Sequence, residues 1–133
     1  MNILKLSFII IFLFSFQDSE DITLKKEFLI GTWVNEDEST RNITRCEIKY
    51  DEGKFFVKIW GACSPQDCYW GEKSSNNIKR KTGKIEILWD HGFSENYQYI
   101  SSNGQNLFIK TECTYKDDSG RPDFTINDMF IRE

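Results

Sequence analysis

The chain has 133 residues, among them 17 basic and 21 acidic ones, and a formal net charge of −4. Charges of both signs are scattered along it, so it offers no basic groove, and nucleic acid is excluded as an expected partner. The length suits one domain with a single modest core. Four cysteines in so short a chain make a disulfide or a metal site the first question.

The N-terminal stretch predicts export. Lys5 precedes an unbroken apolar run over residues 6–16, and the polar sequence DSED follows. A run of about eleven residues is too short to span a bilayer and matches the apolar region of a signal peptide. We therefore expect residues 1–17 to be a signal peptide and residues 18–133 to be one secreted or periplasmic domain, with no stable membrane insertion after signal removal. A retained N-terminal anchor is the alternative.

Short β-rich runs recur through the rest of the chain. After one helical turn expected within residues 21–29, the predicted strands are 28–35, 42–50, 54–62, 68–74, 84–90, 95–101, 106–115 and 123–132. The connectors are rich in Gly, Asn, Asp and Ser, and they are too short for parallel crossovers. The strands should therefore be antiparallel neighbours.

Alternating side chains support several of these strands. Cys46 and Ile48 share one face of their strand, and Ile85, Ile87 and Trp89 share one face of theirs. Eight such strands form an up-and-down barrel or a sandwich. We favour the barrel, because it removes the sheet edges and both prolines of this chain fall in turns instead of protecting an edge.

The stretch WGACSPQDCYWG, residues 60–71, is almost symmetric and predicts a hairpin. A tight turn with Pro65 at its second position would place Cys63 opposite Cys68, close enough for a disulfide. A redox pair would have two intervening residues at a helix start instead of four in a hairpin. Zinc is disfavoured because His91 is the only histidine and export favours oxidised cysteines.

The same register would place each tryptophan of the hairpin opposite a glycine. Trp70 would face Gly61 and Trp60 would face Gly71, so that each indole covers a bare backbone. The near-symmetry of residues 60–71 is therefore explained by the structure of a hairpin and does not require an active site.

The two remaining cysteines leave two alternatives open. Cys46 and Cys113 both lie on apolar strand faces, so they either bond to each other across a flattened or opened barrel or remain buried thiols. A direct bond needs Cα atoms within roughly 7 Å.

Several motifs carry a resemblance. GTWVN, NITR, WGACSPQDCYWG and DDSGRPDFTINDMFIR resemble a family of small exported bacterial domains that share a Trp-Gly-x-Cys-x-Pro-x-Asp-Cys-x-Trp-Gly core, and this resemblance implies no activity. More distantly, Gly31-Thr32-Trp33 on the first strand and Arg132 on the last resemble the calycin barrels, the lipocalins and avidins. That resemblance implies that Trp33 and Arg132 stack and close one barrel end.

The avidin resemblance also implies ligand-binding positions. Asn35, Ser39 and Asp128 match avidin positions whose polar groups hold the urea ring of the ligand. The avidin tryptophans that wall the apolar part of the ligand have no clear counterpart here, and ordinary turn chemistry explains Asn35 and Ser39 as well.

Catalytic chemistry finds little support in the sequence. His91 lies beside Asp90 in a turn, where adjacent side chains diverge, so we expect a solvated turn instead of a general base. The carboxylates of NEDES and YKDDSG lack the spacing of a calcium loop. No cofactor or metal is predicted, and an enzyme acting at the barrel rim is the second alternative to binding.

The sequence therefore predicts a monomeric, all-β, calycin-like, eight-stranded antiparallel barrel that acts as a non-catalytic binding or structural module. A small, partly apolar molecule is the candidate ligand. It would enter at the end opposite Trp33 and Arg132, where Trp89, Tyr97 and Tyr99 are expected to point inward. Rings packed on one another with no cavity are the alternative.

Overall fold

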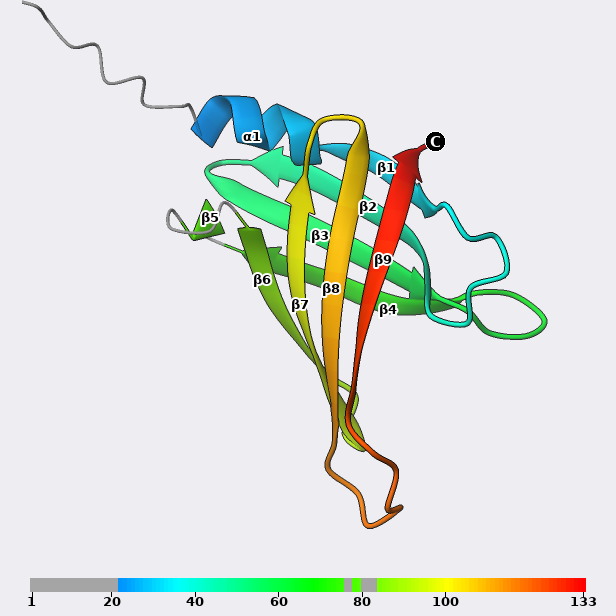
Figure 1. Cartoon of the computed structure of the whole chain (residues 1–133). Coiled ribbons are helices and arrows are strands. Elements are labelled where there is room, and N and C mark those ends of the chain that lie inside the picture. The colour runs from blue at the N-terminus through cyan, green and yellow to red at the C-terminus, as the bar shows by residue number, and fades with distance from the viewer. Residues whose placement is uncertain (1–21, 76–77, 80–83) are drawn as a thin grey trace, which may run out of the picture.

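The computed structural model describes residues 22–75, 78–79 and 84–133. The predicted signal peptide lies outside these residues. Figure 1 shows the helix beside a strongly curved sheet. The helix is α1 (Ile22–Leu29), and the strands are β1 (Gly31–Asn35), β2 (Ile43–Asp51), β3 (Lys54–Gly61), β4 (Cys68–Ser75), β5 (Ile78–Lys79), β6 (Lys84–Asp90), β7 (Ser94–Ser102), β8 (Asn106–Tyr115) and β9 (Phe124–Arg132).

The strands form one antiparallel sheet in the order β4-β3-β2-β1-β9-β8-β7-β6-β5. Strand β1 pairs with β2 on one side and with β9 on the other, so the first and last strands join. Chain neighbours are sheet neighbours everywhere except between β4 and β5. The predicted all-β class and the up-and-down barrel of eight main strands are confirmed, with the two-residue β5 as an addition.

The barrel is nearly closed, and its opening lies between β4 and the pair β5 and β6. Apart from Trp70 at the bulge, the inward positions of β4 are Gly71, Lys73 and Ser75, which pair with buried residues of β3. This row is small or polar, so β4 has little apolar surface to bury against β6. Side chains bridge the gap instead: Trp70 lies 5.9 Å from Trp89 between ring centroids. The expectation that the barrel removes every sheet edge is wrong at this seam.

The hairpin of β3 and β4 has a register that differs from the predicted one. Trp60 pairs with Tyr69 and Gly61 pairs with Cys68, two residues away from the predicted partners. A bulge after Ile59, which leaves Trp70 as an extra residue in β4, accounts for one of these two residues. Trp70 still covers Gly61, where an added Cβ would meet the indole Nε1 at 2.6 Å.

The bulge changes the other predicted pair. The expected cover of Gly71 by Trp60 is wrong, since nothing lies within 4 Å of an added Cβ at Gly71. Trp60 packs instead against Tyr69, with ring centroids 5.1 Å apart. Gly71 pairs with the inward Ile59 and Trp60 pairs with the outward Tyr69, so Trp60 and Gly71 lie on opposite faces of the hairpin.

Apolar side chains fill much of the barrel interior. Burial alternates along β3, β6 and β7 as the period of two requires. The apolar side chains with no exposed surface are Trp33, Cys46, Ile48, Val57, Ile59, Ile85, Ile100, Leu107 and Phe130. Burying a large apolar side chain contributes about 1.5–3 kcal/mol, so this core is the main source of stability.

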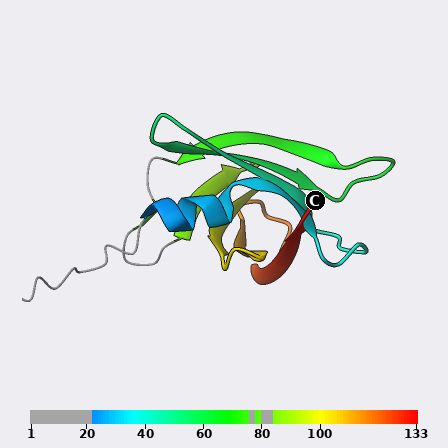
Figure 2. The same ribbon diagram turned by 90° about the horizontal axis from the view of Figure 1, so that it is seen from above.

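One end of the barrel is closed by α1, which crosses it between the β2–β4 side and the β6–β9 side (Figure 2). Trp33 is completely buried and donates a hydrogen bond from Nε1 to the Leu29 carbonyl, 2.9 Å away. The Arg132 guanidinium lies 4.1 Å from the centroid of the Trp33 ring and donates to the Ile30 carbonyl at 2.8 Å. The predicted stack of Trp33 and Arg132 is present.

Two glycines permit this closure. Gly31 has a φ of +142°, and a Cβ there would meet the Arg132 guanidinium at 2.7 Å. Gly104, in the turn between β7 and β8, lies under Phe28 of α1, whose ring would be 3.1 Å from an added Cβ. The helix and the arginine can therefore approach the barrel end closely only because both positions lack a side chain.

Candidate functional site

A cavity of about 590 Å³ opens at the end of the barrel opposite α1. It lies among the connectors at 36–42, 62–67 and 91–93 and the ends of β8 and β9. Its volume falls within the range of small-molecule sites, which is about 300–1,000 Å³. An eight-stranded barrel can hold one small ligand, and here the interior is filled at one end and hollow at the other.

The wall of the cavity on β7 and β8 is polar. Ser94, Asn96, Thr111 and Cys113 line it, and all four side chains are buried in the barrel. Behind them, Trp89 donates from Nε1 to the Gln98 Oε1 at 2.9 Å, and Gln98 in turn donates to the Thr111 hydroxyl at 3.5 Å. Buried polar groups need partners, and this chain of hydrogen bonds holds the wall in place.

One carboxyl group, that of Asp128, lines the same cavity from β9. Its Oδ1 accepts a hydrogen bond from the Asn35 amide at 3.2 Å, and that amide also donates to the Ile43 carbonyl at 2.8 Å. Its Oδ2 is buried and has no partner among the described residues. Burial raises the pKa of Asp128 above its usual value, against the opposing effect of the Asn35 hydrogen bond, and the charge of Asp37 adds to the rise.

The rim of the cavity is aromatic. Tyr69, Phe93 and Phe124 line it and are 54%, 51% and 40% exposed, an uncommon exposure for large rings. The Arg121 guanidinium lies 4.1 Å from the Tyr115 ring centroid and 5.5 Å from that of Phe93. The rim thus combines apolar faces with an affinity for cations.

His91 also borders the cavity, at the seam of the barrel. Its ring lies 4.8 Å from Trp70 between centroids, and its Nε2 is buried with no partner among the described residues. Burial lowers the pKa of His91, and the charge of Asp90 opposes this effect. The expected solvated turn is therefore correct for Asp90, which is exposed and accepts from Lys116 and Gly92, and wrong for the histidine.

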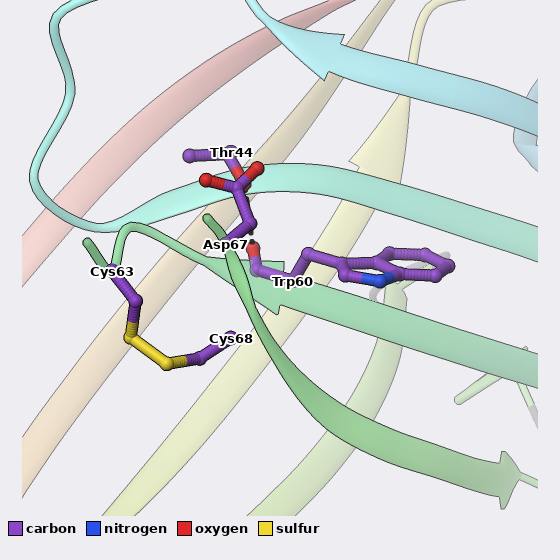
Figure 3. The surroundings of a disulfide bond; sticks show 5 residues. All are labelled: Thr44, Trp60, Cys63, Asp67 and Cys68. Atoms are coloured by element: carbon purple, nitrogen blue, oxygen red, sulfur yellow. Dashed lines mark hydrogen bonds between the residues drawn. A yellow bond between two sulfur atoms is a disulfide. The ribbon is translucent and has the colours of Figure 1, made fainter. Parts of the chain in front are cut away.

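The predicted bond between Cys63 and Cys68 is present and ties the connector of β3 and β4 at the cavity rim. Figure 3 shows this disulfide beside a hydrogen bond that links the same hairpin to β2. There the Thr44 hydroxyl of β2 donates to the Asp67 carboxylate at 2.7 Å and lies 3.3 Å from the Trp60 carbonyl. The rim loop is therefore held both covalently and by hydrogen bonds to the neighbouring strand.

Cys46 and Cys113 are both buried and unbonded, so of the two alternatives the disulfide is wrong. Cys46 pairs with Trp33, which pairs with Arg132, whereas Cys113 pairs with Phe124. These positions on β9 are eight residues apart, about 26 Å along the strand. Burial raises the pKa of both thiols, which stay protonated and weakly reactive.

The structure brings together only some of the predicted ligand contacts. Asp128 lines the cavity, and Asn35 and Trp89 support its wall through the hydrogen bonds above. Ser39 is exposed in the β1–β2 connector, where its amide donates to the Asp37 carboxylate. It forms turn chemistry and does not border the cavity.

The expectation that Tyr97 and Tyr99 point inward is wrong. Burial on β7 follows Ser94, Asn96, Gln98 and Ile100, so the tyrosines lie on the outer face. Tyr97 donates to the Glu86 carboxylate at 3.0 Å, and the Lys110 ammonium lies 5.7 Å from the Tyr99 ring centroid. Tyrosine can cover an outer surface in this way because its ring is apolar and its tip is polar.

Because the tyrosine face of β7 was expected to point inward, the polar side chains that do point inward from this strand, Ser94, Asn96 and Gln98, were not predicted. On composition alone, the two tyrosines are the more apolar face of residues 95–101. The signal that decides the face is the connector at 91–93, which pairs Asp90 with Glu95 and Trp89 with Asn96. Since Trp89 points inward, its partner Asn96 does as well.

Further comparisons add no assignment. No cluster of three or more metal-binding side chains occurs within residues 22–75, 78–79 and 84–133. No helix in this part of the chain is long and apolar enough to cross a membrane. Comparison with protein-family models, with curated proteins and with solved structures finds no match. Functional inference therefore depends on the cavity itself.

Proposed function

We propose that the protein is an exported, calycin-like, non-catalytic binding module that takes a small, partly apolar molecule into the open end of its barrel. The observation that carries this proposal is the 590 Å³ cavity opposite the Trp33 and Arg132 closure. The disulfide at Cys63 and Cys68 is compatible with an oxidising compartment outside the cytoplasm.

The distribution of side chains supports binding. A barrel that served only as a structural element would gain stability from apolar side chains at every inward position. This barrel instead places Ser94, Asn96 and Thr111 inward at the hollow end and rings at its mouth. Pockets that bind small molecules combine apolar surface with a few fixed polar groups in this manner.

Catalysis finds less support at the same cavity. The side chains of nucleophile type in its wall are Ser94, Thr111 and Cys113, and burial raises the pKa of the Cys113 thiol. A nucleophilic cysteine needs the opposite, a lowered pKa in electropositive surroundings. Asp90 and His91 interact with different partners, Lys116 and Trp70, and do not form a base with its orienting carboxylate.

A cavity-filling substitution tests the proposal. We expect the neutral fluorescent probe N-phenyl-1-naphthylamine to bind the oxidised protein saturably at one site. Thr111→Phe should weaken this binding about tenfold or more, because Thr111 is 93% buried in the cavity wall and a ring there occupies the ligand space. Fluorescence titration measures the affinity, and thermal unfolding confirms that the variant folds.

The matched control lies three residues along the same strand. Thr114→Phe places the same ring on the exposed outer face of β8 and should leave the probe affinity unchanged. Absence of saturable binding to the wild-type protein, or equal loss in both variants, would contradict a ligand site in the barrel.

A further inference from the structure

We propose, building on the binding function above, that the cavity selects a ligand with a protonated amine next to an apolar or aromatic body, and that Asp128 anchors the amine. The body of the ligand would lie between the rings of the rim. The two parts of the ligand correspond to the two parts of the cavity, a carboxylate on the wall and aromatic side chains at the mouth.

The first step is the position of Asp128 inside the barrel. On β9 it pairs with Ile109 of β8, which is buried, and Phe130, two residues along on the same face, has no exposed surface. A carboxyl group in such a row costs stability unless it is paired, so a chain selected for packing alone would carry an apolar residue there. Its presence at the cavity wall points to a role toward a ligand.

The second step is the missing partner. Asn35 satisfies Oδ1, while the buried Oδ2 accepts no hydrogen bond from the described residues. No ion pair joins Asp128 to a cation in the described part of the chain. The cavity is also lined by Arg41 and His91, and neither donates to this carboxylate. A hydrogen-bond donor is what this oxygen lacks.

The third step is the choice among ligand charges. An ammonium group supplies both the hydrogen bond and the opposite charge, and charge-assisted hydrogen bonds are about twice as strong as neutral ones. A neutral donor supplies only the hydrogen bond. An anion would be repelled by Asp128 and by Asp37, whose charge already acts on it.

The rim favours the same charge. Phe93 and Tyr115 already lie against one cation of the chain itself, the Arg121 guanidinium, which forms an ion pair with Asp117 at 2.7 Å. Aromatic faces attract ammonium groups in the same way. A cation that enters the cavity therefore passes favourable surfaces before it reaches Asp128.

Three probes of one shape test this inference by isothermal titration calorimetry at pH 7. They are 1-naphthylmethylamine, 1-naphthalenemethanol and 1-naphthoate, which are cationic, neutral and anionic. We expect the amine to bind about tenfold or more tighter than the alcohol, and the naphthoate to bind weakest. In Asp128→Asn the amine and the alcohol should bind within about threefold of each other. Asp118→Asn, which removes the same charge from an exposed loop, should keep the preference of the wild-type protein.

The outcomes separate this inference from the function on which it rests. If the alcohol binds as tightly as the amine, or the naphthoate binds tightest, the barrel is a ligand site and the amine anchor is wrong. If Asp128→Asn keeps the full preference for the amine, another group provides the anchor. If no probe binds and N-phenyl-1-naphthylamine does not bind either, both proposals fall. Should Asp128→Asn fail to fold, the three affinities of the wild-type protein still decide the question.

Discussion

The two ends of this barrel are built from the same strands and differ in what their inward side chains do. At the α1 end, Trp33 is completely buried, its indole N–H is satisfied, and Arg132 covers its ring. At the other end, Asn96 and Thr111 point inward and a carboxylate oxygen of Asp128 has no partner among the described residues. The interior is tightly packed at the α1 end and lined by polar side chains at the open end. This difference is expected if the closed end provides stability and the open end provides a ligand site.

The seam follows the same division. Beside the hollow end, β4 and β6 meet through Trp70, Trp89 and His91 in place of a backbone ladder. A side-chain contact of this kind can separate at lower cost than a row of strand hydrogen bonds. We therefore expect substitutions at the seam to cost less stability than substitutions at the closed end.

The largest effect should come from Trp33. Trp33→Ala should lower the free energy of unfolding by about 3–5 kcal/mol, because it empties a fully buried site and removes the surface under Arg132. Trp70→Ala should cost roughly half as much, since Trp70 is only half-buried and its neighbours lie at the seam. Urea denaturation followed by circular dichroism measures both.

The ratio of these two effects tests the comparison. A near-neutral Trp33→Ala would show that Trp33 does not close the barrel, and the calycin-like build proposed above would lose its main support. Equal effects of both substitutions would show that the seam is as firmly packed as the closed end.

A smaller effect is expected from the disulfide at the open end. Replacing Cys63 and Cys68 together by serine should lower the free energy of unfolding by about 2 kcal/mol, because the bond closes a short loop and so removes only modest entropy from the unfolded chain. The double variant avoids leaving one free thiol. Urea denaturation of the oxidised wild type and the variant gives the difference, and a loss as large as that of Trp33→Ala would show that the loop organises the whole barrel.

Much of the fold could be predicted from the sequence because its signals are local. The strand ranges follow from alternation and turn residues, and short connectors require antiparallel neighbours. The closure by Trp33 and Arg132 came from a resemblance and is present. The seam was not predicted, because it depends on a bulge in β4 that was not recognised. Its one local sign is an isolated glycine inside the strand, Gly71, which takes a positive φ.

The site was harder to predict because it depends on which face of a strand points inward. Asp128 was identified from an avidin-like position, and it does line the cavity. Tyr97 and Tyr99 were assigned to the wrong face, since by composition they form the more apolar side of their strand and only the pairing with β6 shows that this side faces outward. The rim rings of Tyr69, at the start of β4, and Phe93, in the connector of β6 and β7, are far apart in sequence. They line one cavity across the seam, where no strand pairing links their elements.

The smallest effect, and the one that most directly compares stability with function, is expected at Asp128. Desolvation raises its pKa in the folded protein above the unfolded value, so its charged form is disfavoured by folding. The wild-type protein therefore gains stability as the pH falls through the raised pKa, and this gain is complete below the unfolded value of about 3.9. Asp128→Asn does not titrate at this position. It should be more stable than the wild type at pH 7, and the difference should shrink steadily as the pH approaches 3.

Thermal unfolding of both proteins from pH 3 to pH 8 measures this difference. Other groups that titrate over the same range, His91 among them, are present in both proteins and largely cancel. Asp118→Asn, in an exposed loop, should show no comparable gain at pH 7. If Asp128→Asn is instead less stable at pH 7, the carboxylate is already well accommodated by its surroundings. Asp128 would then be part of the packing of the barrel, and the open end would no longer differ from the closed end in the way that a binding site requires.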